Sequence, residues 1–224
     1  MYELIEHLKN KHWLWRGSET SLECECQTSG YPELDQQLGG GFPTQGVVEL
    51  KTPVGIGEIR LLLPYLSQDS ERLTVLINPP GNVSAEAFHH AGMPIDKILI
   101  LTPTSSKEAL WAAEQCLKSG ACAHVLLWQD EIEVHQARRL QVASETGQCL
   151  QFLFRSVTKP LFSLPVTLSM RLKANDEGIT ISITKRKGGW PAEPFLVSFD
   201  HYWQNLTVPK STSVVVPFPI RKQG

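Results

Sequence analysis

The segment from Gly46 to Leu63 constrains the fold of this chain most strongly. Residues 46–51 are apolar and β-branched, which is typical of a buried strand. Residues 52–57 form a loop with one proline and two glycines, and the residues that follow have the apolar spacing of a helix. Strand, glycine loop and helix together make the framework of a P-loop, where loop amides and a helix N-terminus bind a polyphosphate. The order predicts an α/β core built around this strand.

The same segment lacks the side chains that hold a nucleotide in a P-loop. Where such a loop has Gly-Lys-Ser/Thr, this chain has Gly57-Glu58-Ile59. A unit-charge pair about 4 Å apart is worth about 4 kcal/mol at an effective dielectric near 20, so replacing the lysine by a carboxylate is costly for phosphate binding. We therefore predict no nucleotide, no other cofactor and no catalytic residue. The predicted degenerate P-loop comprises Thr52, Pro53, Gly55, Gly57, Glu58 and Ile59.

Strands and helices alternate through the first two thirds of the chain. This alternation predicts a parallel sheet flanked by helices on both faces. Strands are expected at residues 46–51, 73–78, 97–101, 124–128 and 150–154, with further strands at 166–172, 179–184 and 195–199. Because only turns separate the last three strands, we expect them to form an antiparallel C-terminal extension of the sheet. The predicted parts are an N-terminal helix and arm (1–27), a core domain (28–203) and a C-terminal tail (204–224).

Composition argues against several function classes. The 224 residues are 42% hydrophobic and carry a formal net charge of -2, so the chain as a whole does not attract nucleic acid or an anionic membrane. No apolar run approaches the roughly 20 residues of a membrane span, and no signal peptide is visible. The five cysteines have no disulfide-framework or metal-site spacing. We expect a cytoplasmic protein without a metal.

Several stretches resemble RecA, and they occur in the RecA order. They are residues 29–49 before and within the first strand, 89–99, 108–121 and 181–187. The resemblance implies a RecA-like P-loop-type core over about residues 28–200. It also implies where catalytic carboxylates would stand, and both positions lack them: Asn78-Pro79-Pro80 follows the second strand, and Trp128-Gln129 ends the fourth. ATP hydrolysis needs these groups together with the metal, so the chain is expected to be a pseudo-ATPase.

Within that superfamily the chain is similar to the ImuA family, the RecA-like accessory proteins of SOS mutagenesis. The stretches that carry this resemblance are residues 14–17, 53–64, 109–115, 138–141 and 152–155. The resemblance implies a non-catalytic adaptor in the DNA-damage response. Its partners would be RecA and ImuB, a Y-family polymerase-like protein, and through ImuB an error-prone replicative-type DNA polymerase that performs translesion synthesis.

Three groups of residues are candidate contact sites. Lys185, Arg186 and Lys187 stand where RecA lysines reach the nucleotide of the next protomer, which suggests docking on RecA and capping or trimming of its filament; a basic strand end without a partner is the alternative. Exposed aromatics often anchor interfaces, which makes Trp13, Trp15 and Phe42 candidates, although the tryptophans could equally pack on their own domain. Arg138, Arg139 and Arg155 are candidate phosphate contacts for weak or indirect DNA binding, the alternative being solvated charges.

Two other functions compete with the adaptor. One is a divergent ATPase that uses Glu58, which the three absent catalytic groups oppose. The other is a SulA-like cell division inhibitor that binds FtsZ and blocks its polymerisation. SulA is a shorter relative that shares parts of the later half, and the RecA-like N-terminal half of this chain argues against that function. The oligomeric state stays open between a monomer, a dimer and an arm-mediated assembly.

Overall fold

The computed structural model describes residues 25–69, 71–157, 163–186, 193–200 and 203. The expected helix at residues 2–11, the Trp13 and Trp15 arm and the C-terminal tail lie outside the described residues. The division of the chain into 1–27, 28–203 and 204–224 therefore stays a prediction.

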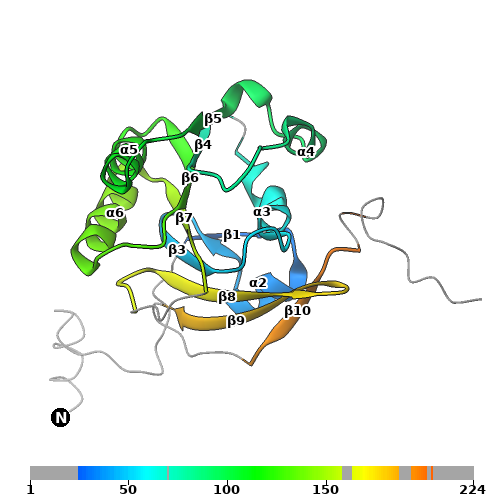
Figure 1. Cartoon of the computed structure of the whole chain (residues 1–224). Coiled ribbons are helices and arrows are strands. Elements are labelled where there is room, and N and C mark those ends of the chain that lie inside the picture. The colour runs from blue at the N-terminus through cyan, green and yellow to red at the C-terminus, as the bar shows by residue number, and fades with distance from the viewer. Residues whose placement is uncertain (1–24, 70, 158–162, 187–192, 201–202, 204–224) are drawn as a thin grey trace, which may run out of the picture.

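One sheet of eight strands organises the described residues (Figure 1). In spatial order its strands are β10 (Phe195–Ser198), β9 (Gly178–Arg186), β8 (Leu168–Asn175), β3 (Gly46–Lys51), β7 (Leu150–Arg155), β6 (Cys122–Trp128), β4 (Leu73–Ile77) and β5 (Ile98–Leu101). A two-stranded sheet pairs β1 (Cys26–Gln27) with β2 (Phe42–Pro43). The helices are α2 (Pro32–Leu38), α3 (Glu58–Leu66), α4 (Ala85–His90), α5 (Ser106–Lys118) and α6 (Val134–Gly147), with a 3-10 turn η1 (Ile95–Lys97) before β5.

The strand directions confirm an α/β fold with a large, mostly parallel sheet flanked by helices. Strands β3, β7, β6, β4 and β5 pair in parallel along the sheet. One expectation needs a correction, because β8 pairs with β3 in parallel, with Val48 opposite Leu168. The antiparallel part begins one strand later than expected, at the β8–β9 hairpin, and continues to β10.

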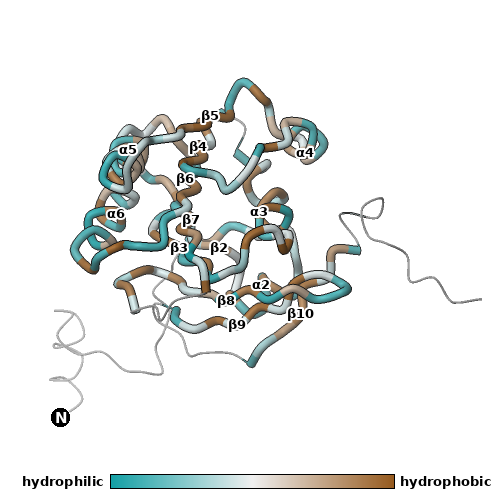
Figure 2. The backbone as a smooth tube through the Cα atoms, in the orientation of Figure 1, coloured by the Kyte–Doolittle hydropathy of each residue, from teal (hydrophilic) through white to brown (hydrophobic). Residues whose placement is uncertain are grey.

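Each face of the sheet has its own hydrophobic core, and Figure 1 shows α3 and α4 on the side opposite α5 and α6. Alternation along β3 illustrates the division, since Val48 and Leu50 pack with α3 whereas Val47 packs with α5 and α6. Brown segments in Figure 2 mark these apolar strands inside the molecule. Within the described residues, no helix is long and apolar enough to cross a membrane.

Helix ends show which local signals the sequence carries. Ser105 caps α5 by accepting a hydrogen bond from the amide of Glu108. The Glu108 carboxylate accepts a hydrogen bond from the amide of Thr104 (3.1 Å). Helix α6 begins with a reciprocal box between Glu133 and Gln136 that the sequence analysis did not anticipate.

Candidate functional site

The carboxyl ends of β3, β7, β6 and β4 meet at one edge of the sheet, the usual ligand-binding edge of a parallel sheet. A cavity of about 190 Å³ lies there. It is lined by Thr52, Val54, Glu58, Pro80, Trp128, Gln129, Asp130, Phe154, Arg155 and Ser156. The strand–loop–helix segment at residues 46–63 therefore borders this cavity.

The Glu58 side chain is bound by backbone amides of the loop between β3 and α3. One carboxylate oxygen accepts a hydrogen bond from the amide of Gly55 (3.0 Å), and the other accepts from the amide of Gly57 (3.1 Å). Glu58 is only 4% exposed and is the first residue of α3, where the helix dipole favours a negative charge. The loop amides that could bind a phosphate thus bind an internal carboxylate. This arrangement leaves no positive group in the loop for an external anion.

A buried ion pair lies at the end of β3 and β7. Arg155 donates from Nη1 to Oε1 of Glu49 (2.7 Å), and both side chains are almost fully buried. Lys51 Nζ lies 3.3 Å from the same carboxylate, and Ser169 donates to its other oxygen (2.6 Å). Arg155 also donates from Nε to the carbonyl of Asp130 (3.2 Å). Arg155 was predicted to contact phosphate, and in the structure its guanidinium pairs with Glu49 inside the protein.

The remaining groups of this cavity serve the structure. Trp128 and Phe154 stack at 4.4 Å with nearly parallel rings. Asp130 accepts a hydrogen bond from the amide of Ser156 (2.6 Å), so this carboxylate holds a loop. Among the described residues, no group of three or more His, Cys, Asp or Glu is placed to hold a metal ion. Trp128, Phe154 and Asp130 are thus each held by a neighbour within the chain.

The other candidate contacts lie apart from this cavity. Arg138 is exposed on α6, whereas Arg139 contacts Glu114 on α5, and Glu114 also pairs with Lys118 (2.5 Å). These opposite charges lower the pKa of the Glu114 carboxyl, with the hydrogen bond from Lys118 as the largest cause. The two arginines thus occupy the outer α5–α6 layer of the molecule rather than the strand ends.

The strand end at Lys185 and Arg186 is bound to its own chain. Lys185 donates from Nζ to the carbonyl of Leu164 (2.6 Å), and Arg186 donates from Nη1 to the carbonyl of Gln37 (3.3 Å). Lys187 lies outside the described residues. Phe42 was a candidate contact, and that prediction is wrong: the ring is fully buried, 5.2 Å from Tyr65 and 5.3 Å from Phe152.

Trp111 is a surface feature that the sequence analysis missed. Its side chain is 63% exposed on the outer face of α5. Beside it lies a small cavity of about 140 Å³, lined by Lys107, Leu110, Trp111, Glu114, Gln136, Arg139 and Leu140. The available signal was helical spacing, because Lys107, Trp111 and Lys118 follow one another at intervals that place a tryptophan on a charged helix face.

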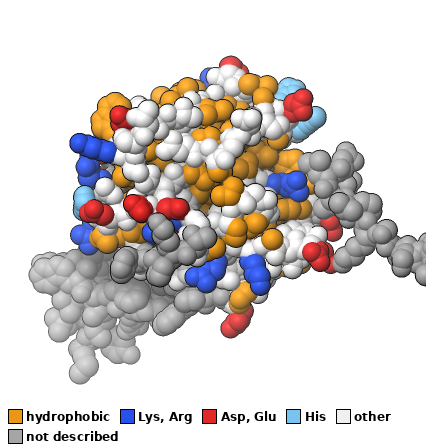
Figure 3. Space-filling model, viewed as in Figure 1, with side chains coloured by type: hydrophobic (Ala, Val, Ile, Leu, Met, Phe, Trp, Pro, Cys, Tyr) orange, Lys and Arg blue, Asp and Glu red, His pale blue; other side chains and the backbone are white. Residues whose placement is uncertain are grey.

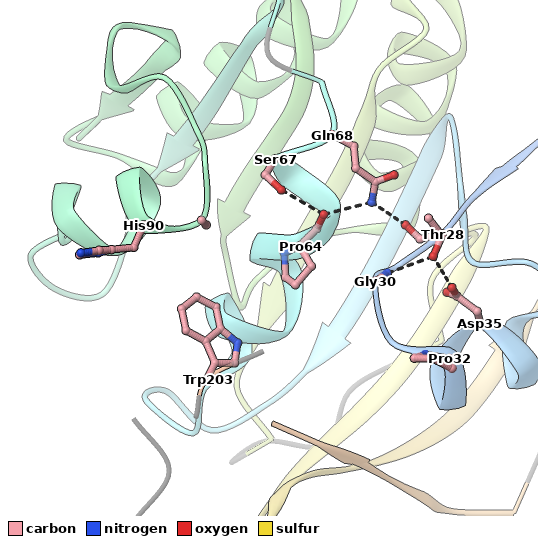
Figure 4. A pocket seen from close by; sticks show the side chains of 10 residues that line it. Thr28, Gly30, Pro32, Asp35, Pro64, Ser67, Gln68, His90 and Trp203 are labelled. Carbon is pink, nitrogen blue, oxygen red and sulfur yellow. Dashed lines mark hydrogen bonds between the residues drawn. The ribbon is translucent and has the colours of Figure 1, made fainter. Parts of the chain in front are cut away.

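A larger cavity, of about 490 Å³, lies between α2, α3 and α4 (Figure 4). Its polar side chains bond within the chain: Thr28 donates to Asp35, and Gln68 donates to the carbonyls of Thr28 (2.9 Å) and Pro64 (3.0 Å). Trp203 forms one wall and donates from Nε1 to Tyr31 Oη (3.2 Å). The arrangement offers an indole and proline surface rather than a charged ligand site.

Comparison with known proteins shows which family this chain resembles. The family model described as "Cell division inhibitor SulA" matches residues 49–151. A cell division inhibitor SulA from Photorhabdus laumondii is 34% identical over 98 residues, covering 43% of this chain and 55% of that protein. SulA from Yersinia pestis (strain Pestoides F) is 30% identical over 124 residues, covering 54% of this chain and 72% of that protein. The chain belongs to the SulA family.

Coverage of the relatives is partial. The chain spans 55% and 58% of the length of the Photorhabdus and Serratia marcescens relatives. A solved structure of SulA from Pseudomonas aeruginosa is 24% identical, with a TM-score of 0.41, over 49% of this chain and 97% of that one.

The family assignment corrects the predicted identity. The expected ImuA membership and the expected adaptor role in translesion synthesis and DNA repair are wrong, and RecA, ImuB and an error-prone polymerase are withdrawn as partners. Three of the stretches that suggested ImuA, residues 53–64, 109–115 and 138–141, lie inside the SulA-matched segment. Because the SulA family model covers these stretches, they do not distinguish an adaptor from a division inhibitor.

Proposed function

We propose that this chain is a cell division inhibitor of the SOS response that binds FtsZ and blocks its polymerisation. The observation that carries the proposal is the match of the SulA family model to residues 49–151, which begins within β3 and ends within β7. The matched segment includes α5, α6 and every strand from β4 to β6. The relatives are named as cell division inhibitors, and this core is the part of the chain that resembles them.

We further propose that inhibition is stoichiometric and needs no catalysis. The strand–loop–helix segment is a degenerate P-loop in a RecA-like core, with Glu58 in place of the phosphate-binding lysine. The two amide contacts of its carboxylate support this proposal, because they leave the loop occupied from within. A protein that inhibits by contact needs a surface instead of an active site.

The exposed apolar side chains support contact through the matched core. Of the eight large hydrophobic residues that are exposed among the described residues, all but Val157 lie within residues 49–151. Trp111 is the largest of them and stands beside the α5–α6 cavity. Tryptophans next to well-packed cavities are typical interface anchors. We propose the Trp111 face as the FtsZ contact.

Sedimentation of polymerising FtsZ tests this function. The chain, added in increasing amounts to a fixed amount of FtsZ, should reduce the pelleted FtsZ in proportion to the chain added. An equal amount of an unrelated protein of similar size is the control and should leave the pellet unchanged. A pellet that stays constant at a several-fold excess of the chain would exclude FtsZ as the target.

A further inference from the structure

Three of the cysteines gather where α5 ends and β6 begins. Cys116 lies in the last turn of α5, Cys122 is the first residue of β6, and Cys149 directly precedes β7. Cys122 and Cys149 belong to the core between the sheet and the α5–α6 layer, and Cys116 packs against that core. All three are free thiols. The proposed function uses none of them.

A short turn joins the two elements and brings Cys116 and Cys122 together. Ser119 ends α5; its hydroxyl donates to the carbonyl of Cys116 (2.8 Å) and lies 3.8 Å from Cys122 Sγ. Gly120 has a φ of 70°, which turns the chain back towards the sheet, and the amide of Ala121 donates to Ser119 Oγ (3.1 Å). Within this turn the Cys116 side chain is hydrogen-bonded to that of Cys122.

The surroundings of this pair favour a thiolate. The hydrogen bond from Cys116 lowers the pKa of Cys122 from 9.0 to about 7, and the same bond raises the pKa of Cys116, so the two sulfurs share one proton. Arg72 adds a positive charge: its Nη1 donates to the carbonyls of Cys122 (3.4 Å) and Gln148 (2.8 Å). The thiolate is the nucleophilic form of cysteine, so the pair is reactive near neutral pH.

Cys149 differs from the pair in exposure and in charge. It is fully buried, its Sγ lies 3.8 Å from the carbonyl of Leu150, and burial raises the pKa of its thiol. Cys116 is partly exposed at the end of α5. Figure 3 shows charged side chains on the side of the molecule where Figure 1 places α5 and α6, so solvent reaches this layer. Thiolate character and exposure decide which cysteines oxidise, and both favour the pair.

We propose that Cys116 and Cys122 are a reversible oxidation site, at which a small peroxide converts the two thiols into an intramolecular disulfide. The thiolate sulfur attacks a peroxide oxygen and the O–O bond breaks, which gives a sulfenic acid and hydroxide; the hydroxide takes up the proton that the thiolate had lost. The second thiol then attacks the sulfenic sulfur, the S–S bond forms, and the S–O bond breaks, with water leaving. Two thiols lose two electrons, and one hydrogen peroxide becomes two water molecules.

Tryptic peptide mapping by mass spectrometry tests this site. Cleavage at the basic residues places Cys116, Cys122 and Cys149 on separate peptides, residues 108–118, 119–138 and 140–155. After one equivalent of hydrogen peroxide near neutral pH, peptide 108–118 should be linked to 119–138. This product should exceed the link between 119–138 and 140–155 at least ~10-fold, because a pKa difference of more than one unit separates the thiolates. Dithiothreitol should release both peptides. No link, or another major link among these peptides, would overturn the proposal.

Matched variants show whether the native contact selects the pair. In a background where Cys24 and Cys26 are serine, Cys149→Ser keeps both thiols of the pair and should form the disulfide as the wild type does. Cys116→Ser should form no disulfide. If this variant linked Cys122 to Cys149 as efficiently as the wild type links its own pair, the contact would not select the product and the proposal would fail. Circular dichroism spectra like that of the wild type show that both variants fold. None of these outcomes depends on FtsZ.

Discussion

The carboxylate of Glu58 accepts a hydrogen bond from the backbone amide of Gly55, at 3.0 Å, across the loop that follows β3. The sequence analysis expected this residue to repel a phosphate. In the structure the carboxylate also accepts from the amide of Gly57, so both loop amides are bound by a side chain of the same chain. The first residue of α3 thus holds the loop that precedes the helix.

Glu58→Gln should therefore destabilise the chain. A glutamine side chain has one acceptor oxygen, so its NH2 group would face one of the two loop amides and leave that donor unsatisfied. The expected loss is about 1–3 kcal/mol in the free energy of unfolding, measured by urea denaturation. Glu86→Gln, at an exposed position on α4, is the matched control and should change stability by less than about 0.5 kcal/mol. A Glu58→Gln variant as stable as the wild type would contradict the role given to the carboxylate.

Arg155→Ala should destabilise the chain more strongly than any exposed arginine does. The substitution leaves Glu49 buried with only Lys51 and Ser169 as partners. Removing one partner of a buried ion pair costs about 3–5 kcal/mol, and the remaining partners should keep the loss near the lower end. Arg138→Ala, on the solvent side of α6, should be nearly neutral in the same denaturation assay. Equal stability of the two variants would show that the Glu49 pair contributes little.

The free energy of unfolding should decrease on acidification, over a pH range set by the pKa of His124. Burial lowers the pKa of His124 to about 4 from its usual value of 6.5; its ring lies 5.1 Å from that of Tyr65, and Nδ1 lies 3.3 Å from Thr74 Oγ1. Between these two values the unfolded chain binds a proton that the folded chain excludes. Stability is therefore complete above pH 6.5 and decreases towards pH 4, by an amount on the order of 3 kcal/mol.

Unfolding free energies measured from pH 7 to pH 4 check this dependence. His124→Gln should flatten the slope in that window, whereas His135→Gln, at an exposed position, should keep the wild-type slope. If the slope of His124→Gln equals that of the wild type, other groups cause the acid sensitivity.

Trp111→Ala should weaken inhibition of FtsZ while leaving the fold intact. A 63% exposed side chain contributes little to the core, so the stability of the variant should stay within about 0.5 kcal/mol of the wild type. Loss of an interface anchor typically costs 2 kcal/mol or more, which corresponds to roughly a 30-fold weaker complex. Val142→Ala, also exposed, should inhibit normally. Full inhibition by Trp111→Ala would place the FtsZ contact elsewhere without refuting the function.

The backbone arrangement could be predicted from the sequence because its signals are local. The apolar, β-branched residues 46–51 and the capping residue Ser105 determine a strand and a helix start by their own chemistry. The direction of β8 could not be predicted in this way, because no local pattern in residues 156–167 indicates which strand β8 pairs with. Its position beside β3 depends on contacts more than a hundred residues apart.

The contacts of individual side chains could not be predicted from local sequence patterns. Phe42 and Lys185 were expected at the surface, yet one packs under Tyr65 and the other donates to Leu164. The burial of Arg155 could not be predicted for the same reason, because its partner Glu49 lies 106 positions away in the sequence. The resemblance to ImuA gave the wrong family for a related reason. Most stretches compared with ImuA belong to a core that SulA proteins also have, and shared packing residues do not report a partner.

The critical concentration for FtsZ polymerisation is the measurement that tests the central claim most directly. If the chain sequesters FtsZ without catalysis, the critical concentration should rise one for one with the chain added. The increase should not depend on added Mg-ATP, because Glu58 occupies the loop that would bind it. An unchanged critical concentration would contradict the proposed function. An increase that requires ATP would contradict the non-enzymatic mechanism.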